Sequence, residues 1–172
     1  TRKESSAASD VYKRQEDIVE VAADAFRNVD FDESSIKKYD IESVVLPKNI
    51  EKIGDFAFQS NNIKEIDFSE NNNLKEIGKG AFMNNKIESL LLNDEIEKID
   101  DAAFHINKIE MLFLQGGHLK YIGKSSFRQN NISILYLISN ELKEISDMAF
   151  LENDIQGELD LSQLPNLKKI GV

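Results

Sequence analysis

Residues 77–92 read "IGKGAFMNNKIESLLL", and this stretch decides the fold. It ends in the triplet Leu90-Leu91-Leu92, whose outer members lie two residues apart. Side chains with this spacing share one face of a β-strand, so the triplet predicts a short strand with one buried face. Just upstream, the three-residue spacing of Leu74 and Ile77 suits a turn or a short helix instead.

The same pattern recurs through the chain, and phenylalanine marks its place in each copy. The last five of these phenylalanines are 24, 22, 23 and 23 residues apart. A unit this short cannot bury its own apolar side, but stacked units bury a continuous core. The marker residues are Phe26, Phe58, Phe82, Phe104, Phe127 and Phe150.

Stacked units of this kind predict an α/β-type repeat solenoid. Each turn of about 23 residues contributes one short parallel β-strand from its L-x-L triplet, and these strands form a sheet along one side. The other side is expected to hold short helical or irregular segments. A glycine follows the second isoleucine in several copies, as at Gly54, Gly78 and Gly123, and we expect a turn there that needs a permissive φ.

The copies resemble the leucine-rich repeats of the BspA-like surface proteins of bacteria and some protists. The stretches "IGKGAFMNNKIESLLL" and "IGDFAFQSNNIKEIDF" (residues 53–68) are close to the pattern of that family. The resemblance covers about residues 41–172, with a degenerate copy at 16–31. It implies a cell-surface or secreted protein used in adhesion or protein–protein contact.

One repeat position departs from the family pattern, which often has cysteine three residues after the phenylalanine. Here that position is always asparagine. An inward asparagine repeated from turn to turn can bond the backbone groups that a buried bend exposes. We therefore predict a structural ladder of Asn61, Asn85, Asn107, Asn130 and Asn153.

The two ends of the chain look different from the repeats. Residues 1–15, "TRKESSAASDVYKRQ", match a translated sequencing adapter and are interpreted as a disordered, non-native tail of a metagenomic fragment. Residues 16–172 are predicted to form the solenoid, incomplete at both ends, and 16–40 an irregular first repeat with an insertion. The last strand, around Leu159 and Leu161, is expected to be an open edge, so self-association through the repeat ends is expected.

Composition narrows the classes of partner. The chain holds 21 basic and 31 acidic residues, a formal net charge of −10. This balance argues against nucleic acid and anionic lipid, both of which attract basic residues. No apolar run approaches the ~20 residues that a membrane helix needs, so membrane insertion is not expected. There is no cysteine, which excludes disulfides and thiolate metal sites.

The outward positions of the predicted sheet point to a binding site. In each triplet the middle residue, and the residue before the triplet, face away from the core. These positions are acidic towards both ends of the chain, with Glu65 and Asp67 in one copy and Glu158 and Asp160 in another. In between they are apolar, and we predict a partner-binding patch for a protein or glycan ligand at Leu91, Met111, Phe113, Ile134 and Tyr136.

An apolar patch on these strands is also compatible with functions that involve no ligand. Residues of high β propensity fill strand positions without any ligand, and self-association or a neighbouring part of a longer protein would also cover them. A structural spacer that presents another domain is the alternative function, and an intracellular scaffold is a third.

No constellation of residues predicts catalysis. His105 and His118 fall in different repeats without a second histidine or a nucleophile pattern nearby. Gly116-Gly117 reads as a turn, since no helix-opening phosphate loop follows. Asp100-Asp101 lacks the pattern of a calcium loop. The chain is therefore predicted to be no enzyme and to need no cofactor or metal.

Overall fold

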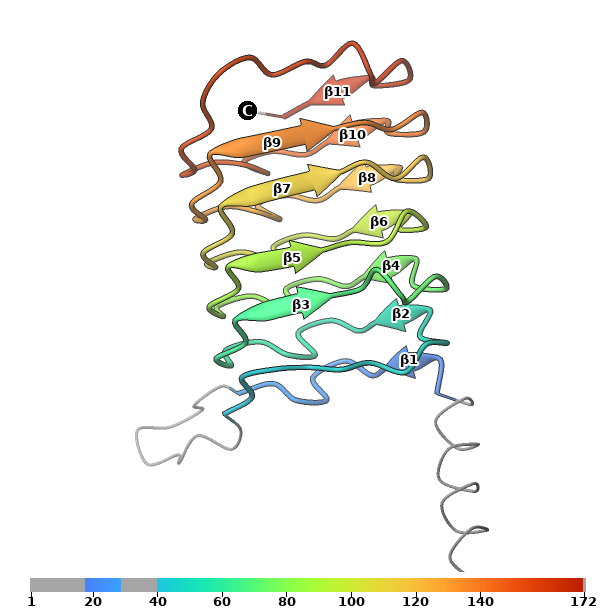
Figure 1. Ribbon diagram of the computed structural model, residues 1–172, viewed down its shortest axis with the longest axis vertical. Helices are drawn as coiled ribbons and strands as arrows, with labels where there is room; N and C mark the ends of the chain where they lie inside the picture. Colours follow the sequence, from blue (N-terminus) through green and yellow to red (C-terminus); the bar gives the residue numbers. More distant parts are fainter. Residues whose placement is uncertain (1–17, 29–39, 172) are drawn as a thin grey trace, which may run out of the picture.

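The computed structural model describes residues 18–28 and 40–171, which wind into a parallel β-solenoid (Figure 1). The proposed adapter tail and most of the inserted segment lie outside the described residues. The middle coils contribute strands to two sides of the solenoid, and all the strand pairs are parallel and join neighbouring coils.

The side made by the L-x-L triplets carries two short sheets. One joins β3 (Glu65–Asp67) to β5 (Ser89–Leu91), and the other joins β7 (Met111–Leu114) to β9 (Ile134–Leu137). Strands β5 and β7 lie side by side between them, so the four strands form one face (Figure 1). The predicted strand in each of these repeats is confirmed.

The opposite side corrects the expectation of short helical segments. There, two-residue strands form a continuous seven-stranded sheet, and the described residues contain no helix. The strands, in order, are β1 (Glu20–Val21), β2 (Lys52–Ile53), β4 (Glu76–Ile77), β6 (Lys98–Ile99), β8 (Tyr121–Ile122), β10 (Glu144–Ile145) and β11 (Lys169–Ile170).

Left-handed backbone explains why the phenylalanine corner cannot be helical. Within the coil of Phe104, both Ala102 and Ile106 have positive φ, 55° and 57°. Such residues end a right-handed helix. The amides at this corner bond to the next coil instead: the N–H of Phe104 donates to the Ser126 carbonyl at 2.8 Å.

Stacked rings and asparagines form the interior. Successive phenylalanine rings from Phe26 to Phe150 stack with centroids 5.2–5.7 Å apart. Asn107 Nδ2 donates to the carbonyls of Phe82 and Phe104 at 2.9 and 3.1 Å, and its Oδ1 accepts the Ile87 N–H at 3.1 Å. The other four asparagines bond in the same way, which confirms the ladder.

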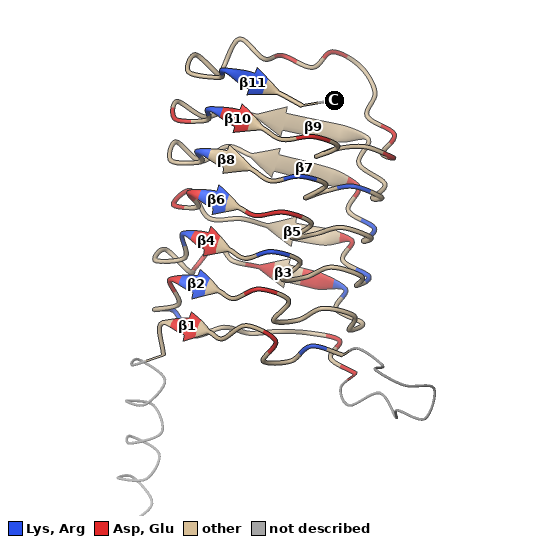
Figure 2. Cartoon of the chain, turned by 180° about the vertical axis from the view of Figure 1, so that it is seen from behind, with Lys and Arg blue, Asp and Glu red and all other residues tan. Residues whose placement is uncertain are grey.

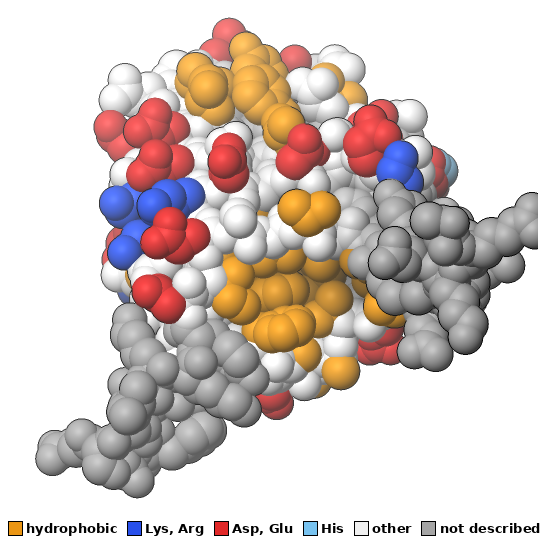
Figure 3. All heavy atoms as spheres, turned by 60° about the horizontal axis from the view of Figure 1, so that its bottom comes forward, with side chains coloured by type: hydrophobic (Ala, Val, Ile, Leu, Met, Phe, Trp, Pro, Cys, Tyr) orange, Lys and Arg blue, Asp and Glu red, His pale blue; other side chains and the backbone are white. Residues whose placement is uncertain are grey.

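The solenoid end at β1 exposes apolar side chains (Figure 3). Val45 is 96% exposed there, beside a cavity of about 400 Å³ that Phe26 and Ile41 also line. Stacked units bury their apolar sides against neighbours, and among the described residues the coil of β1 has a neighbouring coil on one side only. Self-association through such ends stays a prediction.

Candidate functional site

The apolar residues of β7 alternate between the core and the outer surface. Leu112 and Leu114 face the core, with 0% and 3% of their surface exposed. Met111 and Phe113 alternate with them and are 53% and 43% exposed. The alternation is that of a strand with one buried face.

The structure brings the five predicted site residues onto one face. The strand register places Met111 opposite Ile134 and Phe113 opposite Tyr136. The rings of Phe113 and Tyr136 stack with centroids 5.3 Å apart and planes 7° apart. Leu91 stands on the neighbouring strand β5. We call this set the open face: Leu91, Met111, Phe113, Ile134 and Tyr136, all between 42% and 53% exposed.

Sequence reasoning missed one member of the surface beside the open face. Ile138 follows β9 and is 42% exposed. The signal was present, because Ile138 continues the two-residue period of Ile134 and Tyr136. It lies just outside the repeat positions that define the predicted site.

The segment after β9 does not behave as its sequence predicts. The repeat pattern places the last strand at Leu159 and Leu161, but no strand forms there and Leu159 is 43% exposed. Gly157 just before them has a φ of +81°, a left-handed conformation that interrupts an extended chain. As a result β9 is the edge strand, and a groove of about 440 Å³ lies between it and residues 156–163.

Carboxylates flank the open face at both ends. Asp67 Oδ1 accepts the Ser69 N–H at 2.8 Å, and Asp160 Oδ1 accepts the Ser162 N–H at 2.8 Å. Hydrogen bonds from the serine side chain, and then from the serine N–H, lower the pKa of both aspartates, so both are charged at neutral pH. Within the described part of the chain, neither they nor Glu65 and Glu158 form an ion pair.

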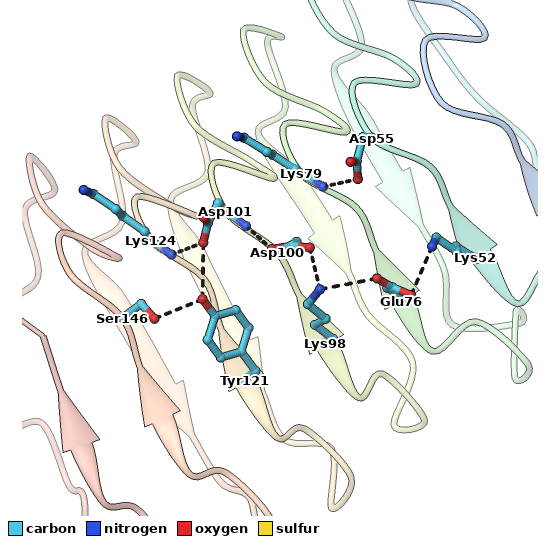
Figure 4. A network of polar contacts seen from close by, with 10 residues as sticks. All are labelled: Lys52, Asp55, Glu76, Lys79, Lys98, Asp100, Asp101, Tyr121, Lys124 and Ser146. Carbon is cyan, nitrogen blue, oxygen red and sulfur yellow. Dashed lines mark hydrogen bonds and ion pairs between the residues drawn. The ribbon is translucent and has the colours of Figure 1, made fainter.

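The seven-stranded sheet on the other side carries charges of alternating sign (Figure 2). Glu76 lies between Lys52 and Lys98, 3.4 Å from each, and Lys98 also reaches Asp100 at 2.5 Å (Figure 4). The hydrogen bond to Asp100 raises the pKa of Lys98. We call this set the paired column: Lys52, Glu76, Lys98, Tyr121, Glu144 and Lys169.

Tyr121 takes a polar role where the alternation of charge is interrupted. Its hydroxyl donates to Asp101 at 3.3 Å and accepts the Ser146 hydroxyl at 3.2 Å (Figure 4). Burial raises the pKa of Tyr121. Beyond it, Glu144 pairs with Lys169 at 2.8 Å. The polar groups of the paired column thus find partners in one another or in the adjacent Asp100, Asp101 and Ser146.

The histidines take part in local contacts. His105 Nδ1 lies 3.0 Å from the Arg128 carbonyl, and His118 Nδ1 lies 3.3 Å from Glu141. The two histidines occupy different coils. Across residues 18–28 and 40–171, no group of three or more His, Asp or Glu side chains is placed to hold a metal ion.

A stacked solenoid with an outward apolar face defines a class of repeat proteins that act through their surfaces. The model of the BspA type leucine rich repeat region matches residues 29–156 with six copies. The chain belongs to this family, as its repeats predicted. Such repeats typically mediate protein–protein interactions and are commonly found in surface or secreted proteins.

Two other comparisons returned nothing. Searches of well-characterised proteins and of solved structures found no match to this chain. In the part of the chain that the structure describes, no helix is long and apolar enough to cross a membrane.

Proposed function

We propose that this chain is a non-catalytic binding module of a cell-surface or secreted protein, and that it holds a protein partner on the open face. The observation that carries the proposal is the stacked pair Phe113 on β7 and Tyr136 on β9, which are roughly half exposed while Leu112, Leu114 and Leu137 on the inner side are buried. Apolar patches of this kind on soluble proteins usually mark an interaction site.

The composition of the face also supports binding. Aromatic residues and methionine are enriched at the centres of protein interfaces, and polar residues form their rims. Here Met111 and Phe113 lie centrally, and carboxylates lie at both ends. A structural spacer has no need of such a face, since the paired column shows that the fold accepts a polar surface equally well.

The size of the face predicts modest affinity. Covering ~400 Å² of apolar surface gives about 10 kcal/mol before costs. Association costs of about 4–15 kcal/mol offset most of that gain. We therefore propose weak or multivalent adhesion, in which several modules or copies bind together.

A binding panel tests the proposal. The chain is displayed on a surface and exposed to extracellular-matrix proteins, cell-surface proteins and glycans, beside a Leu91→Ser/Phe113→Ser variant. A Met148→Ser/Leu151→Ser variant is the matched control, since both residues are exposed and apolar but lie outside the open face. Circular dichroism and thermal unfolding check that all three fold alike.

A protein bound by the parent and the control, and lost by the Leu91→Ser/Phe113→Ser variant, supports the proposal. If only glycans bind, the partner is a glycan and not a protein. If the parent and both variants bind equally, or if the parent binds nothing, the structural spacer becomes the favoured function.

A further inference from the structure

The groove beside β9 is a site that the open face alone does not explain. Its volume is about 440 Å³. Strand β9 forms one wall, and the departing segment forms the other, which carries amides and carboxylates. The polar groups of that second wall are Gln156, Glu158, Asp160 and Gln163.

The ring of Tyr136 presents one face to this groove. Its other face is covered by Phe113, since the two rings stack with planes 7° apart. Stacked rings follow the direction from strand to strand, so the uncovered face of Tyr136 points away from β7, towards the position of the next strand. The groove occupies that position, because no strand forms at residues 158–161.

The charges around the groove are all negative. Glu158 and Asp160 line it, and no Lys, Arg or His among the described residues does. Ser162 bonds Asp160 through its side chain and its N–H, and a carboxylate has about four acceptor positions, so Asp160 can still accept further hydrogen bonds. Two carboxylates without a cation beside an open aromatic face attract a positive group.

We infer that this groove binds an arginine side chain of the partner protein, with the guanidinium over the ring of Tyr136 and its N–H groups on Glu158 and Asp160. This inference rests on the proposed function and names the chemistry of its partner. Arginine fits better than lysine, because a planar guanidinium stacks on a ring and forms paired hydrogen bonds with a carboxylate at the same time.

Charge also argues against the other occupants of this groove. A second copy of the chain brings a net charge of −10 to a negative surface, and the two copies repel. The hydroxyls of a neutral sugar can donate hydrogen bonds to the two carboxylates but leave their charges without a counter-ion. A basic segment of a partner neutralises both.

Peptide binding to the whole chain tests the inference. The probe is an acetylated and amidated Val-Thr-Arg-Thr-Val peptide, and its control carries citrulline, a neutral group of nearly the same shape, in place of arginine. Binding is followed by NMR shifts of the β9 amides and the Tyr136 ring at low salt. We expect the arginine peptide to bind about tenfold more tightly than the citrulline peptide.

Two matched variants locate the cation. Glu158→Gln/Asp160→Asn should reduce the affinity for the arginine peptide to that for the citrulline peptide. Glu65→Gln/Asp67→Asn should leave it unchanged, although these residues hold the same repeat positions and Asp67 accepts the same serine bond. Tyr136→Leu should weaken the arginine peptide more than the citrulline peptide.

Three outcomes would overturn the inference. They are equal affinity for the two peptides, equal losses of affinity in the two charge variants, and no binding of the arginine peptide at millimolar concentration. The panel with the Leu91→Ser/Phe113→Ser variant is scored separately. If that variant loses a partner from the panel but the arginine and citrulline peptides bind equally, the arginine site is refuted and the proposed function stands. A panel without such a partner refutes the proposed function.

Discussion

The paired column and the open face occupy opposite sides of one solenoid and obey the same geometry. In both, a residue meets its counterpart in the next coil at the spacing of parallel strands. Where the counterparts alternate in sign, as Glu76 and Lys98 do, each side chain finds its partner within the molecule. Where they are apolar, as Phe113 and Tyr136 are, they stack and still leave half their surface uncovered.

The difference shows that one repeat can serve stability on one side of the solenoid and partner binding on the other. The repeat unit sets the position of each side chain. The residue type at that position decides whether the side chain finds its interaction partner in the next coil or stays partly exposed. The paired column is complete without a partner, while the open face and its flanking carboxylates are not. Substitutions should therefore affect folding on one side and binding on the other.

The largest effect should come from the interior that both sides share. Asn107→Ala removes three hydrogen bonds to buried backbone groups, two accepted by carbonyls and one donated by the Ile87 N–H. We expect the free energy of unfolding to fall by about 3 kcal/mol, because the Ile87 N–H left unpaired costs about 1–3 kcal/mol and each carbonyl loses one of its bonds. The carbonyls of Phe82 and Phe104 keep their bonds from Asn85 and Asn130. Urea unfolding measures the loss.

The control for this substitution is Asn131→Ala, because Asn131 is exposed and its side chain forms no hydrogen bond in the described structure. It should leave stability nearly unchanged. An equal loss from both substitutions would mean that the ladder has no special role, and that the two sides do not share a common support.

A smaller effect is expected from a charge reversal in the paired column. Lys98→Glu places a negative group beside Glu76 and Asp100, where a positive group now bonds both. We expect a loss of about 1 kcal/mol in urea unfolding at low salt, and a smaller loss in about 1 M NaCl, because these side chains are partly exposed and screened.

Lys108→Glu changes the net charge equally at an exposed position that forms no ion pair among the described residues, so it serves as the control. If it destabilises the chain as much as Lys98→Glu, general repulsion in an acidic protein accounts for the result. The ion pairs of the paired column would then contribute no more to stability than other surface charges do.

The pH dependence of stability should show a still smaller contribution from two ion pairs, Lys120–Glu97 and Lys169–Glu144. A hydrogen bond from Lys120 lowers the pKa of Glu97, and one from Lys169 lowers that of Glu144. The folded chain then binds fewer protons than the unfolded chain near the ordinary glutamate pKa of 4.5. This contribution is fully present above that value and is lost as pH falls through the lowered pKa values.

Urea unfolding between about pH 6 and pH 3 measures this contribution in the parent and in a Lys120→Met/Lys169→Met variant. The parent should be the more stable at pH 6, and the two should converge as the pH falls. A constant difference between them across this range would show that the ion pairs do not shift these carboxyl groups.

Much of the open face could be predicted from the sequence because its strands are long enough to carry a period. In "MLFL" (residues 111–114) all four residues are apolar, but the L-x-L position of the repeat places Leu112 inside and the two-residue period then places Phe113 outside. The asparagine ladder was equally accessible, since one residue type recurs at one repeat position. Both predictions depend only on register, which a repeat supplies.

The seven-stranded sheet could not be predicted in the same way. Its strands are two residues long, too short to show any alternation, and their hydrogen bonds come from a neighbouring coil rather than from nearby sequence. Gly123 shows a related failure. The repeat pattern predicts a permissive φ for it, but it has no positive φ; a Cβ there would lie 2.4 Å from the Asp100 backbone, so close packing requires the glycine.

The groove beside β9 was also beyond the sequence pattern. Leu159 and Leu161 repeat the triplet of the earlier coils, yet the chain leaves the sheet after Gly157. The period predicts a strand wherever it recurs, and it carries no information about whether a coil stays close to its neighbour. The candidate arginine site depends on that departure.

The smallest effect on folding should come from Met111→Thr. Met111 is 53% exposed, and threonine has the branched shape that strands favour, so the free energy of unfolding should change by no more than about 0.5 kcal/mol. Affinity for a partner found in the binding panel should nevertheless fall. Leu112, the next residue, is fully buried, so a single step along β7 separates a position that serves binding from one that serves folding. A large loss of stability from Met111→Thr would make the open face part of the folding core, and the contrast between the two sides would no longer hold.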